Sequence, residues 1–523
     1  MSRYALGLGL MMAGCRSPVT SIDLEESQLL GSDRAPKATV LSPRAGSWLD
    51  HSEFEVSGTI QSADPISMVT INEVPVLFTD QLEFSQVIAL EPGINTITVA
   101  VETATGTRSE ERVSVIAGPF RSTRWGTPEG GVVELNMRRL ADVGSEVAGV
   151  IGFEDPVVEG EAVDTLERCV VVDGVVTGFA SEIPTVRIEG GDGALDTQTI
   201  WRDVTVQIAG EADVCGEPQP FSLEVTAASL VAESAVGVAL ARDLDGNDRF
   251  FAEASVGAVS WVGEDVRSYD LREPLQVHGL NLEDIGVLEA IEASVRASLE
   301  GRLADAVGAA MTPLVPVDIG LVPPPSVSAS WSIADTVIDE DGVVLSYNLS
   351  TSRQRRRMGY RLRHVVMNSP LQRDGTGAMN VSYSADAINH LLQGAWSKRA
   401  LNGRRNIAPA LDVYFRGRLP AMVHPTDAGL ELRIGELRAQ LADAERGTVD
   451  IFSISATAAV TPDLVWETPT VHITPLHDGE VIPELERAVA VFLEDALINM
   501  MPRPGVFVPG DEADGWVTAH LTD

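Results

Sequence analysis

In its residue types, the acidic stretch ARDLDGNDRF at residues 241–250 is the part of the chain most similar to a metal-binding loop. Its oxygens are of the kind that calcium prefers, and they come from Asp243, Asp245, Asn247 and Asp248. The stretch lacks the glycine that an EF-hand loop has at its sixth position, and Ala254 stands where the final glutamate would be. We therefore favour an acidic hairpin turn and predict no metal site.

Residue types that could support catalysis are present but not grouped. The eight histidines are scattered, and the chain contains no HExxH, no GxSxG and no Cys–His cluster. No pattern pairs a nucleophile with a base. We predict that the protein is not an enzyme and needs no cofactor.

Arginine is concentrated in one region. Between Thr351 and Pro420 there are thirteen Arg or Lys and only three Asp, although the whole chain has a net charge of −38. Guanidinium groups bind phosphate through paired hydrogen bonds, so the region predicts a docking patch for anionic head groups. The alternative, that these side chains pair with the acidic surplus of the chain, stays open. The patch residues are Arg353, Arg355, Arg356, Arg357, Arg361 and Arg363.

The N-terminus predicts export and lipidation. An uncharged, largely apolar run leads to Met-Ala-Gly-Cys, which resembles the lipobox of bacterial lipoproteins, and the run is too short to span a bilayer. We expect a signal peptide at 1–14, a lipid on Cys15 and a flexible tether at 15–36. The alternative is an ordinary short secretion signal. Arg16 is not the Asp associated with inner-membrane retention, so the expected location is the bacterial cell envelope, lipid-anchored at the outer membrane.

Length, charge and cysteine content limit the other possibilities. A chain of 523 residues is too long for a single core, and three domains are the natural expectation. The negative charge argues against nucleic acid as a partner, because a phosphate backbone would be repelled. In an oxidising compartment the expected state of Cys169 and Cys215 is a disulfide worth about 3–4 kcal/mol, with two buried thiols as the alternative.

The elements that must position these residues begin with short alternating strands. Residues 37–117 contain segments such as FEVSGTI and NTITVAV, separated by turns with Pro65, Pro92 and Gly93. This pattern predicts a small β-sandwich. It resembles the bacterial Ig-like modules found beside carbohydrate enzymes and on cell surfaces, and we expect it to act as a spacer.

The rest of the chain repeats one order of elements. A helix with the stripe Leu135, Leu140, Val143, Val147 and Val150 precedes a β-rich section, and a long helix ends at Pro313. After the stiff connector VPPPSV, a helix capped by Ser384 precedes a second β-rich section and a last helix that ends before Pro502. The capped helix has one apolar stripe, from Ile388 to Trp396.

This layout resembles the tubular lipid-binding superfamily, whose best-known member is bactericidal/permeability-increasing protein. The matching segments are GVVELNMRRLADVGSE, MTPLVPVDIGLVPPPSVSASWSI and NVSYSADAINHLLQGAW, within residues 128–523. The resemblance implies an α+β fold of two pseudo-repeated barrels, at 128–321 and 326–523, each a curved antiparallel sheet wrapped on long helices. It also implies a disulfide in the first barrel, where Cys169 and Cys215 lie.

The resemblance further implies an apolar slot for acyl chains between helices and sheet in each barrel. Without it, stripes of Leu and Val at helical spacing more often form ordinary core. The expected function is a membrane-anchored lipoprotein that binds phospholipid or glycolipid and transfers it across the envelope. The alternative is a surface adhesin or scaffold that binds glycan or protein through the Ig-like module. The predicted lipid-binding residues are Leu135, Leu140, Val147, Leu288, Ile291, Val295, Leu299, Leu303, Ile388, Leu391, Leu392, Trp396, Val489 and Phe492.

Overall fold

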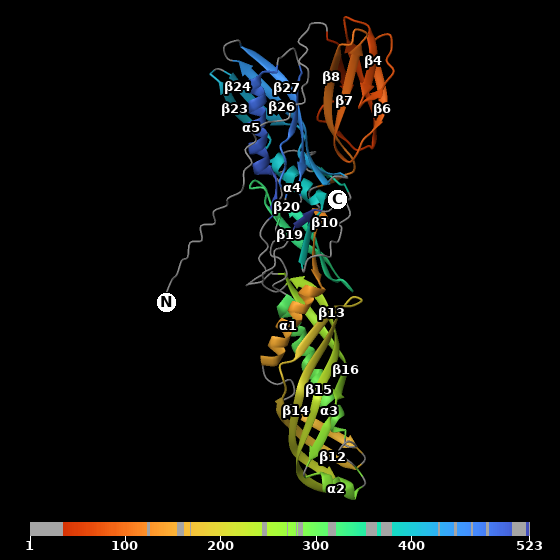
Figure 1. Ribbon diagram of the computed structural model, residues 1–523, viewed down its shortest axis with the longest axis vertical. Helices are drawn as coiled ribbons and strands as arrows, with labels where there is room; N and C mark the ends of the chain where they lie inside the picture. Colours follow the sequence, from red (N-terminus) through yellow and green to blue (C-terminus); the bar gives the residue numbers. More distant parts are fainter. Residues whose placement is uncertain are drawn as a thin grey trace. The chain divides into compact units, whose positions relative to one another are not determined.

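The chain forms two compact units in the computed structural model (Figure 1). The structure describes residues 35–122, 126–153, 162–167, 169–242, 248–268, 270–278, 280, 286–311, 321–351, 363–367, 379–409, 411–426, 429–443, 447–461, 464–476, 481–504 and 519–521. Unit 1 contains Met1–Arg121, Arg363–Met367 and Leu392–Met501, and unit 2 contains the remainder. The predicted signal peptide, Cys15 and the tether up to residue 34 lie outside the described residues. None of the described helices is long and apolar enough to cross a bilayer.

Unit 1 begins with a β-sandwich at the expected place. One sheet has the order β1-β3-β6 (Lys37–Ser42, Glu53–Gln61, Glu83–Ala89). The other has the order β2-β8-β7-β4-β5 (Trp48–Leu49, Arg108–Ala117, Gly93–Thr103, Ile66–Ile71, Val74–Pro75). Alternate residues of each strand point inward, so that Val56, Ile97 and Val115 are fully buried in the core between the sheets.

The second part of unit 1 is a six-stranded sheet with helix α5 (Pro483–Met500). Pro483 opens α5, where its missing N–H costs no hydrogen bond. The rings of Phe492 in α5 and Phe415 in β24 stack at 4.1 Å, and Gly403 in β23 leaves the space that Phe492 fills. The strands are β23 (Asn402–Ala408), β24 (Leu411–Gly417), β26 (Gly429–Asp443), β27 (Thr448–Val460) and β28 (Thr470–Pro475), with β25 (Ala421–Thr426) also paired to β26.

The sandwich and this sheet share a second hydrophobic core within unit 1. Ile94 and Ile116 of the sandwich pack with Leu419 and Met422 of the C-terminal sheet. Buried His424 in β25 accepts a hydrogen bond at Nε2 from the Ile94 N–H, at 3.0 Å. The expected spacer is therefore packed against the C-terminal sheet. A short pair formed by β9 (Phe120–Ser122) and β21 (Arg363–Val365) belongs to the same region.

Unit 2 contains a seven-stranded sheet with very long central strands. Its order is β11-β12-β14-β15-β16 (Ala162–Glu167, Val170–Ala180, Leu195–Val214, Glu217–Arg242, Asp248–Val262). Two short strands, β13 (Thr185–Gly190) and β17 (Asp265–Ser268), pair with β14 and β15. A disulfide joins Cys169 and Cys215, which confirms the predicted bridge.

Helix α3 (Val287–Met311) contacts both edge strands of this sheet, β11 and β16. Helix α1 (Met137–Phe153) packs on β13 and on α3. Because the two edges meet the same helix, the sheet curves around α3 (Figure 1). The short helix α2 (Arg272–Val277) is also part of unit 2, and the sequence pattern did not predict it.

A second, five-stranded sheet of unit 2 has the order β19-β20-β10-β22-β30. Helix α4 (Ala385–Ser397) follows β22 directly, with the Ala387 N–H bonded to Ser384 Oγ at 3.2 Å as the cap predicted. Two points stay predictions: that the chain contains two pseudo-repeated barrels, and that its domains are divided at residues 117, 321 and 326. The strands are β19 (Ala329–Asp339), β20 (Gly342–Thr351), β10 (Thr127–Asn136), β22 (Met379–Tyr383) and β30 (Ala519–Leu521), and a separate pair joins β18 (Leu321–Val322) to β29 (Arg503–Pro504).

Candidate functional site

The buried face of α3 is the first part of the predicted slot. Every fourth residue of the helix is at most 1% exposed, while Leu288 at its start is only half-buried. This spacing forms one continuous aliphatic stripe facing the sheet. The fully buried members are Ile291, Val295, Leu299, Leu303, Val307 and Met311.

Helix α1 and strand β10 add three predicted residues. Leu135 in β10, and Leu140 and Val147 in α1, are all buried. The stripe of α1 ends differently from the prediction, because Val150 is 46% exposed and Ile151 is buried in its place. One turn of an α-helix takes 3.6 residues, so a residue three or four positions after Val147 lies on nearly the same face. Tertiary contacts therefore decide whether Val150 or Ile151 is buried.

The inner face of the curved sheet is aliphatic with a small polar exception. Val206 and Ile208 in β14 are at most 1% exposed, and their inward neighbours are also buried. Thr197 in β14 is buried with its hydroxyl donating to the Ser234 carbonyl oxygen at 3.3 Å, and two further buried hydroxyls are Thr199 Oγ1 in β14 and Ser234 Oγ in β15. Neither has a hydrogen-bond partner within the part of the chain that the structure describes. An unpaired buried hydroxyl costs about 1–3 kcal/mol, so this interior has two donors available to a bound polar atom. Sequence reasoning missed both.

Helix α4 differs from the prediction of one apolar stripe. Ile388, Leu391, Leu392, Ala395 and Trp396 are buried as expected. The polar positions of the helix are also buried, so the helix is covered on every side. These positions are Asp386, Asn389, His390 and Gln393.

His390 holds the first half of α4 to two strands of unit 2. Its Nδ1 lies 2.9 Å from Thr127 Oγ1 at the start of β10, and its Nε2 lies 3.0 Å from Thr351 Oγ1 at the end of β20. Burial lowers the pKa of His390 to about 4, so the imidazole is neutral at physiological pH. These two contacts join the helix to β10 and β20.

The remaining predicted slot residues belong to unit 1. Val489 and Phe492 of α5 are buried, and Phe492 packs on Phe415. Trp396 is 5% exposed, and its indole N–H donates to the Gly417 carbonyl oxygen at 3.1 Å. Its ring lies 6.3 Å from that of Trp48 in the sandwich.

The arginine-rich region is only partly described. The predicted head-group patch, Arg353 to Arg361, lies outside the described residues, as does the side chain of Arg363. Two other members of the region are paired internally. Arg404 forms an ion pair with Asp412 at 2.7 Å, which holds the pKa of Asp412 below its usual value, and Arg405 pairs with Asp495 of α5. The internal-pairing alternative therefore holds for these two arginines.

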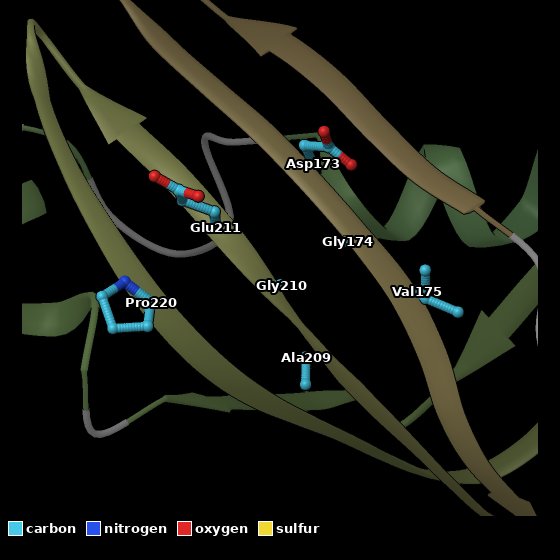
Figure 2. A pocket seen from close by; sticks show the side chains of 7 residues that line it. All are labelled: Asp173, Gly174, Val175, Ala209, Gly210, Glu211 and Pro220. Carbon is cyan, nitrogen blue, oxygen red and sulfur yellow. The ribbon is translucent and has the colours of Figure 1, made fainter.

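A surface pocket of about 540 Å³ lies on the seven-stranded sheet of unit 2 (Figure 2). Gly174 and Gly210 are directly opposite each other in strands β12 and β14. Asp173 and Glu211, also opposite each other, provide two carboxylates and no positive charge lines the pocket. Such a pocket can accept hydrogen bonds from hydroxyl or ammonium groups and repels phosphate. The full lining is Asp173, Gly174, Val175, Ala209, Gly210, Glu211 and Pro220.

Candidate metal ligands are not grouped in the part of the chain that the structure describes. Across the described residues, no three His, Cys, Asp or Glu side chains are grouped to hold a metal ion. The acidic loop at 243–247 lies outside them. The described structure contains a mainly aliphatic interior in unit 2, an acidic surface pocket and a set of surface arginines.

Comparison with known proteins gives low similarity. No protein-family model and no curated protein matches the chain. Among solved structures, a lipopolysaccharide binding protein is 12% identical, with 72% of this chain and 93% of that chain covered and a TM-score of 0.35. Fibronectin(III)-like modules of Clostridium thermocellum CbhA are 12% identical, covering 36% and 92%, with a TM-score of 0.15. A Bacteroides ovatus protein from a mixed-linkage glucan utilization locus, solved with a heptasaccharide, is 11% identical, covering 43% and 70%, with a TM-score of 0.13. These likenesses do not assign the chain to a family.

Proposed function

We propose that this chain is a lipid-binding protein of the bacterial envelope that holds acyl chains between its helices and curved sheet. The observation that carries the proposal is the closure of the seven-stranded sheet on α3. Both edge strands, β11 and β16, contact this one helix, so that the sheet and helix enclose an interior of aliphatic side chains. The proposed fold is that of the tubular lipid-binding superfamily.

The energetics suit a lipid better than a polar ligand. Each methylene buried against aliphatic walls contributes about 0.8 kcal/mol, so an acyl chain gains on the order of 10 kcal/mol before ordering costs. Leu299 and Leu303 of α3 and Ile208 of β14 provide such walls. The unpaired hydroxyls of Thr199 and Ser234 are available to the ester oxygens of a lipid.

The proposal includes location and the absence of catalysis. The lipid on Cys15 would tether the protein to the outer membrane, where bound phospholipid or glycolipid could be transferred across the envelope. The buried side chains of the seven-stranded sheet and α3 are mainly aliphatic, which suits binding of hydrocarbon. The protein is accordingly proposed to carry lipid and not to modify it.

The test is to recover lipid from the protein. The full chain carrying Cys15→Ala, which removes the proposed anchor, would be purified without detergent and examined by native mass spectrometry and by organic extraction. The proposal predicts one or two lipid molecules per chain, lost on extraction and regained from phospholipid vesicles. A chain that is lipid-free when purified and takes up no lipid contradicts it.

A second candidate is binding through the sandwich, as in an adhesin or scaffold. The observation in its favour is exposed apolar surface near β5, where Leu77 is 92% and Val74 is 59% exposed. Large apolar side chains exposed together often mark contact surfaces. Leu77→Ser should then abolish binding to a glycan or protein ligand while leaving lipid content unchanged. Loss of lipid in the same variant would contradict a separate role for the sandwich.

A further inference from the structure

Five cationic side chains of unit 1 form a group that we call the cationic cluster. It consists of Lys398 and Arg399, which follow α4, together with Arg416, Arg418 and Arg438 of the C-terminal sheet. Arg416 in β24 and Arg438 in β26 are directly opposite in register. Both alternate with buried neighbours such as Phe415 and Leu437, so the two arginines share the outer face of the sheet.

Backbone contacts bring the other members to the same place. The Gly417 N–H, between Arg416 and Arg418, donates to the Leu401 carbonyl oxygen at 2.8 Å. The indole of Trp396 donates to the Gly417 carbonyl oxygen at 3.1 Å. The turn that carries Lys398 and Arg399 is thus fixed against the end of β24, since it lies between Trp396 and Leu401.

Arg418 is fixed by its own backbone. Its N–H donates to the Glu436 carbonyl oxygen at 2.8 Å, beside the bulge where β26 passes from Ile434 to Leu437. Gly46 of the sandwich faces the Arg418 side chain, so that a Cβ at Gly46 would lie 3.3 Å from Arg418 Nε. The Arg418 side chain therefore lies beside Gly46 of the sandwich.

One carboxylate lies within the cluster, and its oxygens are already engaged. Glu436 is 1% exposed; Oε1 accepts from Arg438 Nε at 3.2 Å, and Oε2 accepts from Ser453 Oγ at 2.8 Å. Within the described part of the chain, Lys398, Arg399, Arg416 and Arg418 have no ion-pair partner. Glu436 is the carboxylate that acts on Arg418, and its single charge is smaller than that of Arg416, Arg418 and Arg438 together.

Arg416 and Arg438 both repel the charge of Arg418 in the free protein. Burial, and then the charge of Arg438, lowers the pKa of Arg418; Glu436 opposes this shift and Arg416 adds to it. Like charges opposite each other in neighbouring strands are destabilising. The whole chain has a net charge of −38, yet this surface is locally positive. Salt screens charges more than about 8 Å apart, so the distant acidic residues do not cancel the local attraction for an anion.

We propose that the cationic cluster is a binding site for a phosphate group. A phosphate offers acceptor oxygens to several guanidinium groups at once, in the planar geometry that arginine favours, and neutralises the repulsion between them. The site lies in unit 1, on the opposite face of the sheet from its buried core, so it does not depend on acyl chains being bound. Two sources have this chemistry: a lipid head group at a membrane surface, and a free phosphate or phosphomonoester.

The test compares two probes on the full chain carrying Cys15→Ala. One probe is vesicles of phosphatidylcholine with and without phosphatidylglycerol, followed by flotation. The other is inorganic phosphate against sulfate, followed by the amide NMR shifts of residues 398–418. The central variant carries both Arg416→Gln and Arg418→Gln. The control carries Arg108→Gln and Arg112→Gln, which remove the same amount of charge from the sandwich. These two arginines are exposed or half-buried, and both pair with Glu110.

The central variant should bind roughly thirtyfold more weakly and the control should bind as the parent does. A loss on phosphatidylglycerol vesicles alone identifies a head group at a membrane surface, and a loss with inorganic phosphate as well identifies a site for free phosphate. Equal binding by the parent and the central variant to both probes overturns the proposal. If the central variant melts differently from the parent, Lys398→Gln with Arg399→Gln replaces it, and unchanged binding by that variant also overturns the proposal.

Discussion

His424 provides the sharpest test of how unit 1 is held together. Its side chain is 3% exposed, and Nε2 must be unprotonated to accept from the Ile94 N–H. Arg433, which donates to the Ile94 carbonyl oxygen at 3.2 Å, pairs with Glu431, the residue opposite His424 in β26. Burial, and then the charge of Arg433, lowers the pKa of His424 to about 3.

This shift makes unit 1 sensitive to acid. The unfolded chain binds a proton at His424 with a pKa of about 6.5, whereas the folded chain resists protonation until about pH 3. Between these values the unfolded state binds more protons, so stability falls as the pH falls. From about pH 7.5 to about pH 5, His424 should reduce the free energy of unfolding by about 2 kcal/mol. His390, whose pKa is lowered to about 4, should cause a similar loss in unit 2.

The assay is urea denaturation at both pH values, for the full chain carrying Cys15→Ala. His424→Gln removes the titrating group and keeps a neutral acceptor for the Ile94 N–H. The acid-induced loss for unit 1 should therefore shrink by about 2 kcal/mol in this variant. His51→Gln, at an exposed position paired with Asp50, should change nothing. If His424→Gln keeps the parental loss, the buried neutral imidazole is not what makes unit 1 sensitive to acid.

Three further predictions concern other parts of the chain. Leu299→Trp should lower lipid content while the lipid-free protein keeps its melting temperature, and Ala297→Trp, at an exposed position of the same helix, is the control. If Leu299→Trp lowers the free energy of unfolding by about 1–3 kcal/mol and leaves lipid content unchanged, Leu299 belongs to an ordinary packed core. Gly93→Ala should destabilise unit 1 by more than about 2 kcal/mol in urea, because φ is +110° and the new Cβ would lie 2.1 Å from His424 Cε1; a neutral effect would contradict that packing. Cys169 and Cys215 should resist alkylation until reduced, and reduction should cost unit 2 about 4 kcal/mol for a separation of 46 residues; labelling of both in the oxidised chain would rule out the bridge.

Helix α4 illustrates how far the sequence could predict the site. The cap at Ser384 and the stripe from Ile388 to Trp396 identify the helix and its apolar face correctly. Periodicity cannot show that the opposite face is covered too, because Asn389 and His390 are as typical of an exposed face. His390 is stable in the interior because two threonine hydroxyls, distant in sequence, are placed beside its ring nitrogens. Such partners are set by tertiary structure and leave no local pattern.

The arginines show the same limit for charge. Their number in one region is visible in the sequence, but their pairing is not. Arg404 lies beside Asp412 because of the register between β23 and β24, and the separate register between β24 and β26 places Arg416 opposite Arg438. A shift of the register would reverse the side chains' faces and the pairing with them. The sequence therefore predicts a cationic region, and only the fold shows which of its arginines form ion pairs.

The position of a bound acyl chain tests the central proposal most directly. A phospholipid with a photoactivatable group at the end of its acyl chain would be loaded into the full chain carrying Cys15→Ala, and the cross-linked peptides would be mapped by mass spectrometry. The proposal predicts cross-links to the buried face of α3, at Leu299 or Leu303, and to the inward side chains Val206 and Ile208 of β14. Cross-links confined to exposed positions such as Leu77, or none at all, would contradict it.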